Sequence, residues 1–288
     1  MNRLLDAAAL KQYREEGYVS PISVFSTEEA TRLRAAIEAV EAERGPVFRE
    51  DRKQPGDPFK GSYRFKSHLL FKWLADIVRD PRLLDLVEPL TGPDILCWTT
   101  HWFIKEQSSV NYVSWHQDSN YWGVESDRFV SAWLAVSPAS EESGCIRLLP
   151  GSHRGPKMEH VDTWEKDNML TRGQTIMGVD ESKAVKLELQ PGEIALFDYR
   201  LAHASHANQS NDRRIGIGIR YMPPTARQTL ADWDCASLLR GNDIYGHFEL
   251  EPEPSCDFDP LAVAMHQKAD EEQRKIYYQG STRGQAAE

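Results

Sequence analysis

The chain has few cysteines, and none of them lie close together. Its 288 residues include four, at positions 97, 145, 235 and 256, and no two of them form a Cys-x-x-Cys pair. A disulfide framework or a structural zinc site needs closely and regularly spaced cysteines, so neither is the basis of the fold. The four side chains are predicted to be free thiols, which is typical of a reducing compartment.

Long apolar runs, basic clusters and repeats are also missing. No apolar stretch approaches the length of a membrane span, and the first residues lack the pattern of a cleavable signal peptide. The formal net charge is −10, whereas nucleic acids and anionic membrane surfaces are bound by basic surfaces. We therefore expect a cytoplasmic protein that binds neither nucleic acid nor membranes. The sequence does not indicate an oligomeric state.

Helical patterns come early in the chain. Ser26 and Glu29 form a capping-box pattern, and apolar residues follow them at helical spacing. Residues 68–78 and 82–90 carry further amphipathic helical patterns. Residues 1–93 are thus predicted to be a mainly helical buttress.

Strand-like patterns dominate after Pro93, where the hydrophobic period changes from about 3.6 to 2. They occupy about 95–106, 110–117, 128–137, 143–149, 183–189, 193–200 and 213–222. Residues 94–224 are therefore predicted to form a jelly-roll barrel, with a polar, glycine-punctuated insertion at 154–182 that we expect to act as a lid. We expect one mainly β domain with flanking helices, in which 225–288 is an extension with a disordered tail.

Four residues stand in the order and context of a non-haem iron site. His116 and Asp118 form a His-x-Asp triplet, His203 follows 87 residues later, and Arg214 comes eleven residues after that. Two imidazoles and one carboxylate are the ligand set that holds Fe(II) on one face and leaves the opposite positions open. In a chain with nine histidines, one such triplet is expected by chance, and a hydrogen-bonded pair at a strand end is the alternative. The register with His203 and Arg214 favours the metal.

The sequence resembles the phytanoyl-CoA dioxygenase family of Fe(II)/2-oxoglutarate-dependent oxygenases. The resemblance rests on the His-x-Asp triplet, on residues 201–208 with Arg214, and on 149–153 and 90–93, and it spans roughly residues 10 to 224. It implies a double-stranded β-helix, a cupin-like jelly roll, that binds Fe(II), 2-oxoglutarate and O₂. It also implies hydroxylation of a substrate with release of succinate and CO₂.

Arg214 and three further residues are candidates for binding the co-substrate. Arg214 suits the far carboxylate of 2-oxoglutarate, because a planar guanidinium binds a carboxylate through two parallel hydrogen bonds and keeps its charge. Ser205 can add a hydroxyl hydrogen bond to the same carboxylate. Trp133 matches a position that lies beside the co-substrate in the family which the chain resembles. His101 is either a polar group of the pocket or a histidine of the core.

His206 is the rival of His203 for the role of the distal metal ligand. His203 is the histidine followed by the matching serine, and it lies eleven residues before Arg214. We therefore prefer His203, and we expect His206 at the surface or behind the ligands.

Alternation within two predicted strands indicates which side chains face the interior of the barrel. In 213–222, one face has three isoleucines suited to packing on helices, and the other has Arg214, Gly216, Gly218 and Arg220. Such glycines mark a wall that is kept thin where another group approaches the backbone. In 95–106, the face expected to line a polar pocket has Cys97, Thr99, His101 and Lys105.

Contacts with the substrate are predicted from position alone. The candidates are Lys105, Asn120, Tyr121, Trp122, Trp164 and Arg220. Residues 119–122 directly follow the ligand pair, and Trp164, Met169 and Met177 are the expected apolar anchors of the 154–182 insertion. No basic cluster suits the phosphates of an acyl-CoA. We therefore expect a small polar substrate, such as an amino acid, a quaternary amine, an aminophosphonate or a natural-product intermediate.

Three alternatives to a hydroxylase stay open at this point. A non-haem iron halogenase would have a small residue in place of the carboxylate so that chloride could bind iron, and Asp118 argues against it. A desaturase or epimerase of the same fold would share the ligand set. A non-catalytic metal-binding barrel has no need of a cation placed for a dicarboxylate, so Arg214 argues against it.

Overall fold

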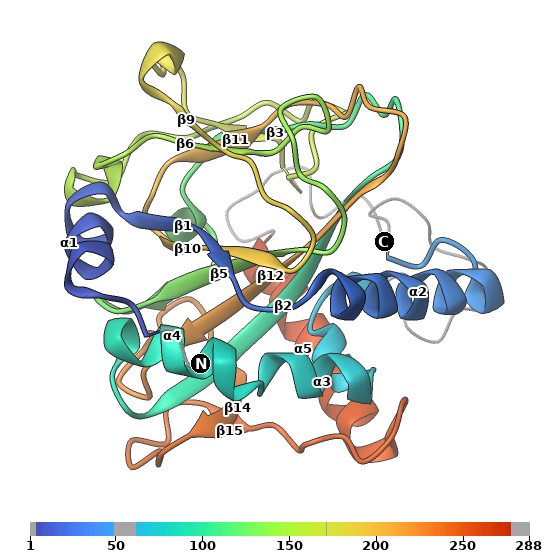
Figure 1. Cartoon of the computed structure of the whole chain (residues 1–288). Coiled ribbons are helices and arrows are strands. Elements are labelled where there is room, and N and C mark those ends of the chain that lie inside the picture. Colours follow the sequence, from blue (N-terminus) through green and yellow to red (C-terminus); the bar gives the residue numbers. More distant parts are fainter. Residues whose placement is uncertain (1–3, 49–61, 171, 278–288) are drawn as a thin grey trace.

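A computed structural model describes residues 4–48, 62–170 and 172–277 of the chain (Figure 1). The α-helices are α1 (Ala7–Glu16), α2 (Thr27–Arg44), α3 (Lys72–Val78), α4 (Pro81–Thr91) and α5 (Pro260–Tyr277). The longer strands are β1 (Tyr18–Ser23), β2 (Ile95–Lys105), β3 (Val113–His116), β5 (Val130–Ala135), β6 (Ile146–Leu148), β9 (Val185–Leu187), β10 (Glu193–Asp198), β11 (His203–Ser205), β12 (Arg214–Met222) and β14 (Cys235–Arg240). Two-residue strands are β4 (Val124–Glu125), β7 (Val161–Asp162), β8 (Gln174–Thr175), β13 (Arg227–Gln228) and β15 (Glu249–Leu250).

Two antiparallel sheets face each other and form the predicted jelly roll. The main sheet has the strand order β1-β10-β5-β12-β2-β14-β15, in which only the last pair is parallel, and the minor sheet has the order β3-β11-β6-β9. Figure 1 shows the minor sheet above the main one. Side chains from both sheets meet in one apolar cluster, where Trp133 and Phe197 of the main sheet pack with Leu148 of the minor sheet. The mainly β, double-stranded β-helix fold is confirmed.

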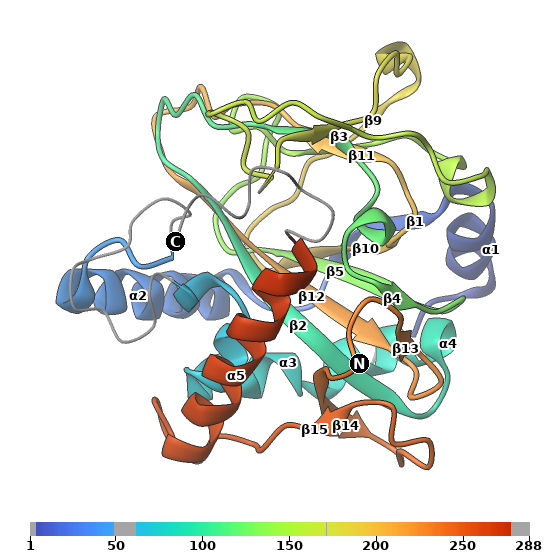
Figure 2. The same ribbon diagram turned by 180° about the vertical axis from the view of Figure 1, so that it is seen from behind.

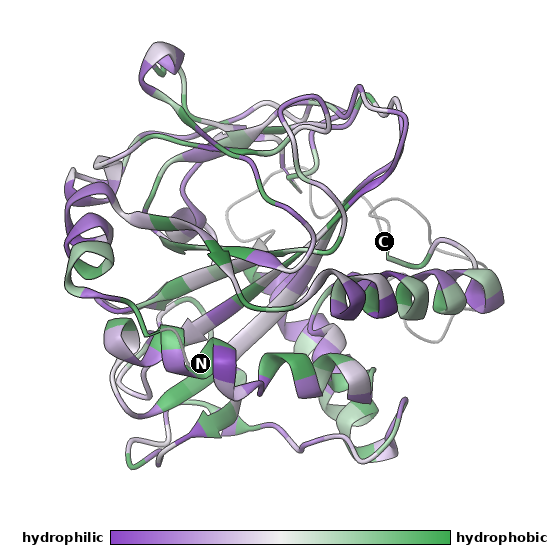
Figure 3. Ribbon diagram, viewed as in Figure 1, coloured by the Kyte–Doolittle hydropathy of each residue, from purple (hydrophilic) through white to green (hydrophobic). Residues whose placement is uncertain are grey.

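Helices cover the outer face of the main sheet, as the isoleucine face of β12 predicted. Ile215, Ile217 and Ile219 are fully buried in a cluster with residues of the helices α2, α3 and α4. Helix α2 begins at the predicted capping box, in which Ser26 and Glu29 each accept a hydrogen bond from the other's backbone. Figure 3 shows hydrophobic and hydrophilic residues interspersed along α2.

A β-bulge changes the predicted faces of β2. Arg220 pairs with Thr99 and the next residue, Tyr221, pairs with Cys97, so Trp98 has no partner on β12. Beyond this bulge, Cys97 turns outward into the cluster under the helices, whereas Trp98 packs against Trp122 on the opposite side. The prediction that Cys97 shares the inner face with Thr99 was therefore wrong, because one extra residue in a strand inverts the alternation beyond it.

Four strands of these sheets were not predicted: β1, β11, β14 and the two-residue β15. β1 contains Pro21 and lies at the edge of the main sheet, where a missing amide hydrogen is tolerated. β11 has only three residues, and β14 lies in the segment after 224 that was expected to be an extension. In each case pairing within the fold, rather than an alternating local pattern, makes the strand.

The 154–182 insertion is attached to the free edge of β3. The amide of Met169 donates to the carbonyl of Tyr112 at 2.8 Å, and the amide of Ile176 donates to that of Trp115 at 2.7 Å. Met169 and Ile176 are buried, but Met177 is 68% exposed, so its prediction as an apolar anchor was wrong. The insertion therefore lies against the minor sheet.

A buried ionic cluster holds the C-terminal segment against β2. The ammonium group of Lys66 donates to the carbonyls of Trp98 and Cys235 and pairs with Glu251 at 2.7 Å. His68 lies 3.0 Å from the other carboxylate oxygen of Glu251. These side chains are almost fully buried, and α5 packs beside this region (Figure 2). We call this group the Lys66–His68–Glu251 cluster.

Among the residues that the structure describes, no helix is long and apolar enough to cross a membrane. The four cysteines are free, as predicted, and three of them are buried. Helix α5 lies in the segment 225–288, which was expected to be an extension of the domain. The expected disorder of the last residues lies outside the described residues.

Candidate metal centre

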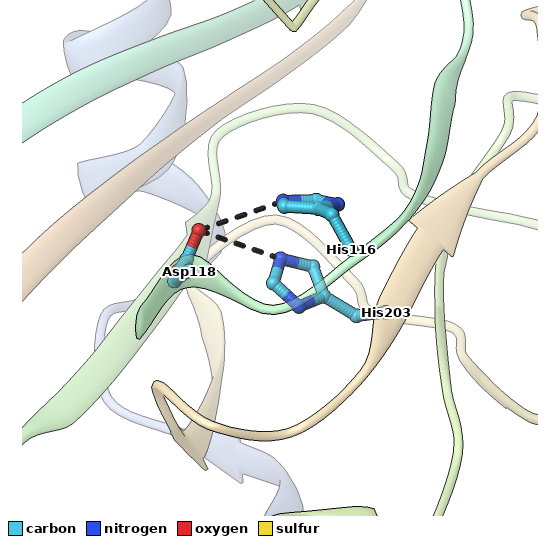
Figure 4. A group of neighbouring side chains, drawn as sticks. All are labelled: His116, Asp118 and His203. Carbon is cyan, nitrogen blue, oxygen red and sulfur yellow. Dashed lines mark ion pairs between the residues drawn. The ribbon is translucent and has the colours of Figure 1, made fainter. Parts of the chain in front are cut away.

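His116, Asp118 and His203 converge at one end of the barrel (Figure 4). His116 ends β3 and His203 begins β11, and the two residues are direct partners in the antiparallel ladder. Asp118 follows β3 in a short 3₁₀ turn, which points its carboxylate back towards the two rings. Its Oδ1 lies 3.5 Å from Nε2 of His116 and 3.9 Å from Nε2 of His203. Three buried donor atoms thus surround one point.

Backbone hydrogen bonds orient both imidazoles. Nδ1 of His116 lies 2.9 Å from the carbonyl of Ser114, and Nδ1 of His203 lies 2.9 Å from that of Leu201. A carbonyl only accepts, so each Nδ1 donates its proton to that carbonyl, and each Nε2 is the nitrogen that faces Asp118. Burial and the nearby His116 lower the pKa of His203 to about 3, which keeps its ring neutral. These are the tautomer and the charge state that a metal ligand needs.

Asp118 has one oxygen for the histidines and one for an arginine. Its Oδ2 lies 3.3 Å from Nη2 of Arg220 and has no hydrogen-bond partner. Burial raises the pKa of Asp118, but the charge of Arg220 and the contacts with the neighbouring imidazoles outweigh burial and lower it to about 2. The carboxylate is therefore ionised at neutral pH, as required of an anionic metal ligand.

The three residues line a cavity of about 1020 Å³ between the two sheets, measured with its opening to solvent. Most of its wall is apolar, with Phe65, Trp122 and Met169 among the lining residues. Of the residues predicted to bind ligands, the wall also includes His101, Tyr121, Trp133, Ser205, Arg214 and Arg220. A largely apolar cavity with a few convergent polar groups is typical of small-molecule sites.

Arg214 lies on the wall of this cavity. It is 1% exposed, and its Nη1 donates to the carbonyl of Gly144 at 2.6 Å while its Nε has no partner. Its cross-strand neighbour Lys105 donates to the hydroxyl of Ser205 at 2.7 Å. Burial and the charge of Arg214 hold the pKa of Lys105 well below its usual range. Lys105, a candidate for the substrate, thus lies with the co-substrate candidates Arg214 and Ser205.

Trp133 explains the first of the two inward glycines of β12. A Cβ atom on Gly216 would lie 1.9 Å from the Trp133 ring, so only glycine lets the indole lie flat on this strand. The ring centroid is 5.4 Å from Cζ of Arg214, which is cation–π distance. The glycines predicted that another group approaches the backbone here, and at Gly216 that group is the side chain of Trp133.

Some predicted residues do not reach the cavity. Asn120 and Trp164 are half-buried and do not line it, and Trp164 has positive φ in the 154–182 insertion. His206 is exposed, as expected, and only its backbone carbonyl accepts a hydrogen bond, from Lys105. His101 does line the cavity, and burial, together with Arg64 and Arg220, holds its pKa well below the usual range. Its ring is therefore neutral.

Two cavity residues, Arg64 and Phe65, were missed because they belong to the segment predicted to be helical. Phe65 forms an isolated bridge with His101 of β2, which places it on the wall. No local pattern marks this bridge. Gln117, which lies between His116 and Asp118 in the chain, was missed as well. Its backbone amide donates to Nε2 of His160, and its side-chain oxygen accepts a hydrogen bond from the backbone amide of Met158. It joins the ligand turn to the 154–182 insertion.

The model of the phytanoyl-CoA dioxygenase (PhyH) family matches residues 13–216, which is most of the chain. Among solved structures, the apo form of the non-heme monooxygenase ThoJ has a TM-score of 0.79 at 30% identity, over 93% of this chain and 97% of that one. CytC3, at 24% identity and a TM-score of 0.65, shares the fold over 90% of this chain and 97% of its own.

Curated relatives with different substrates also cover most of the chain, and two of them serve as examples. A probable alpha-ketoglutarate-dependent hypophosphite dioxygenase of Stutzerimonas stutzeri is 27% identical over 83% of this chain and 82% of its own length. An ectoine dioxygenase of Bordetella parapertussis is 25% identical over 75% of both chains. The similarity thus extends over both sheets and includes the cavity.

Proposed function

The chain belongs to the phytanoyl-CoA dioxygenase family and is an Fe(II)- and 2-oxoglutarate-dependent oxygenase, and we propose that it hydroxylates a small polar molecule in the cavity between its two sheets. In this proposal His116, Asp118 and His203 hold the iron, and Arg214 holds the co-substrate. The proposal agrees with the relatives named above, which are dioxygenases of small molecules.

The side chains fit an iron ion on their own chemistry. The set contains two imidazoles that each face a backbone carbonyl through Nδ1 and one ionised carboxylate, all buried and with ligand atoms within 4.8 Å of one another. Two imidazoles and a carboxylate suit Fe(II), and they leave positions for a chelating 2-oxo acid and O₂. Bound there, the iron supplies the O₂-dependent oxidation, with 2-oxoglutarate as the source of two electrons.

The protein's own residues bind and orient the co-substrate, and they exclude water from the site. Arg214 has an unpartnered Nε and only two backbone acceptors, so it can take the far carboxylate of 2-oxoglutarate, with Ser205 and Lys105 beside it. Trp133, flat on Gly216, limits the width of this end of the cavity. Aromatic residues over the rest of the wall keep water away from the reacting groups.

One observation carries the proposal: the three metal-ligand candidates and the buried Arg214 lie on the wall of the same cavity. A metal-storage barrel would gain nothing from an unneutralised buried guanidinium, which costs several kcal/mol to desolvate. The carboxylate of Asp118 occupies the place that a halogenase leaves for chloride.

The test is formation of succinate and of an oxidised product. We would incubate the protein with Fe(II), 2-oxoglutarate, O₂ and a panel of amino acids, quaternary amines and phosphonates, and analyse the products by mass spectrometry. We expect substrate-dependent succinate and a product that gains one oxygen atom, with neither formed by Asp118→Ala. A product that loses two hydrogen atoms would indicate a desaturase instead. An unchanged mass with inverted configuration would indicate an epimerase.

A further inference from the structure

Arg220 is a buried cation at the cavity that the metal centre does not fully use. Its side chain is 4% exposed and lies among the residues that line the cavity. One nitrogen, Nη2, faces Asp118 at 3.3 Å, whereas Nε and Nη1 have no hydrogen-bond partner. A buried donor without a partner is costly, so two such donors on one guanidinium indicate that a ligand completes them.

The position of the guanidinium is set by the second inward glycine of β12. A Cβ atom on Gly218 would lie 2.3 Å from Nη1 of Arg220, so the guanidinium lies over this glycine. Gly218 pairs with His101 and Arg220 pairs with Thr99 on β2, and both of these polar side chains also line the cavity. On its other side the guanidinium lies 5.1 Å from the centre of the Trp122 ring. Arginine, imidazole and hydroxyl therefore meet at one place on the wall.

The charges of the site with metal ion and 2-oxoglutarate bound indicate the charge of the ligand that Arg220 would bind. Without metal, Asp118 and Arg220 balance each other. A divalent ion adds two positive charges, and dianionic 2-oxoglutarate with Arg214 adds one negative charge in total. These five groups together then carry one net positive charge in a largely apolar cavity, where an unbalanced charge is costly. A group with one negative charge would restore neutrality.

We propose that the substrate carries an oxyanion, either a carboxylate or a phosphonate-type group, and that Arg220 binds this group over Gly218, beside His101 and Thr99. The inference rests on the proposed function, because it assumes that Arg214 and the metal take 2-oxoglutarate. It narrows the substrate class from small polar molecules to small anions, and it excludes quaternary amines that lack an acidic group. It gives Arg220 a binding role in addition to its pairing with Asp118.

Small probes test this before any substrate is known. Methylphosphonate, acetate and methylammonium would be titrated calorimetrically into the anaerobic protein loaded with Fe(II) and 2-oxoglutarate. We expect both anions to bind and methylammonium not to bind. Arg220→Gln should weaken anion binding at least roughly tenfold, the loss of one charge-assisted contact. Arg32→Gln is the matched control, because Arg32 is 70% exposed on α2 and its loss changes the net charge equally.

Gly218→Ala is a second variant that keeps the charge. The new methyl group must push the guanidinium aside without removing it, and Gly218 does not have a positive φ that would strain alanine. Anion binding should weaken while Fe(II) affinity stays within about threefold of wild type. Equal anion affinity in wild type, Arg220→Gln and Gly218→Ala would overturn the proposal, as would preferential binding of methylammonium.

The charge-transfer absorption of the Fe(II)–2-oxoglutarate chelate distinguishes failure of this proposal from failure of the proposed function on which it rests. If that absorption forms in the wild type but no anion binds, the inference on Arg220 fails and the oxygenase assignment of the site stands. If the anions abolish the absorption, they displace 2-oxoglutarate, and Arg220 serves the co-substrate instead. If the absorption never forms, the proposed function itself fails.

Discussion

Two buried ionic clusters lie on opposite sides of β2, and they differ in how completely their polar atoms are satisfied. In the Lys66–His68–Glu251 cluster every charged or ring atom has a partner. The carboxylate of Glu251, for example, accepts hydrogen bonds from Lys66, Cys235 and Ser237. In the cavity, Oδ2 of Asp118 and two nitrogens of Arg220 have none. The two clusters are about equally buried, so burial does not distinguish them.

The difference separates a structural cluster from a binding site. Complete pairing fixes one arrangement of the chain, because any change leaves a buried charge without a partner. Incomplete pairing is stable only if something else, a metal or a ligand, supplies the missing contacts. The first cluster therefore determines whether the protein folds, and the second determines what it binds. Variants in the two clusters should affect different measurements.

The largest effect is expected for Glu251→Ala. It leaves Lys66 charged and buried, which should cost about 3–5 kcal/mol of unfolding free energy. Urea unfolding measures this. Glu249→Ala is the control, because Glu249 pairs with Lys268 at the surface, where such a pair is worth about 1 kcal/mol or less. Similar losses in both variants would contradict the structural role of the cluster.

His203→Ala should show the opposite behaviour. It removes a neutral side chain with a free lone pair, so Fe(II) affinity should fall by more than roughly a hundredfold. The unfolding free energy of the metal-free protein should change by only about 1 kcal/mol, an ordinary substitution effect. Metal titration and urea unfolding on the same samples compare the two. His206→Ala, at an exposed position, should bind metal as wild type does, and if it alone loses the metal, His206 is the ligand.

Arg214→Ala should separate co-substrate binding from metal binding. The loss of a buried charge-assisted contact should cost about 2–5 kcal/mol, or roughly thirtyfold or more in the dissociation constant of 2-oxoglutarate. Fe(II) affinity should be nearly unchanged. Arg214→Lys should recover only part of the loss, since an ammonium lacks the two parallel donors. Unaltered 2-oxoglutarate affinity in Arg214→Ala would remove Arg214 from the co-substrate site.

The smallest effect concerns pH and His68. Burial lowers the pKa of His68 below 6.5 despite its contact with Glu251, so the folded state binds a proton less readily than the unfolded state. The stability from this group is fully present above pH 6.5 and is lost as the pH falls through the folded pKa. One such proton contributes a slope of at most about 1.4 kcal/mol per pH unit. His68→Gln should therefore flatten the stability curve below pH 6.5, and parallel curves would refute this.

The grouping of His116, Asp118 and His203 could be predicted because it depends on short spacings in the chain. His116 and Asp118 are two residues apart, and the distance from His203 to Arg214 favoured His203 over His206; His203 is the histidine that lies beside the pair. The inner face of β12 was also predicted, because strict alternation holds over its nine residues. Such features depend only on local spacing.

Features that depend on pairing between distant segments could not be predicted. The bulge at Trp98 inverts the faces of β2, and no local pattern marks the residue that is skipped. Phe65 reaches the cavity through a bridge to His101, and Glu251 reaches Lys66 across more than half of the chain. Each of these contacts is decided by the folded arrangement of the sheets.

The backbone hydrogen bonds to His116 and His203 have a consequence for sequence divergence. In each case the orienting group is the carbonyl two residues earlier, at Ser114 and Leu201, and every residue type has that carbonyl. The backbone of the strand therefore sets the orientation of the two imidazole rings, which does not depend on a neighbouring side chain. Residues 114 and 201 can drift during evolution without turning the imidazoles, so the cavity around the metal can be remodelled for new substrates while the ligands keep their orientation.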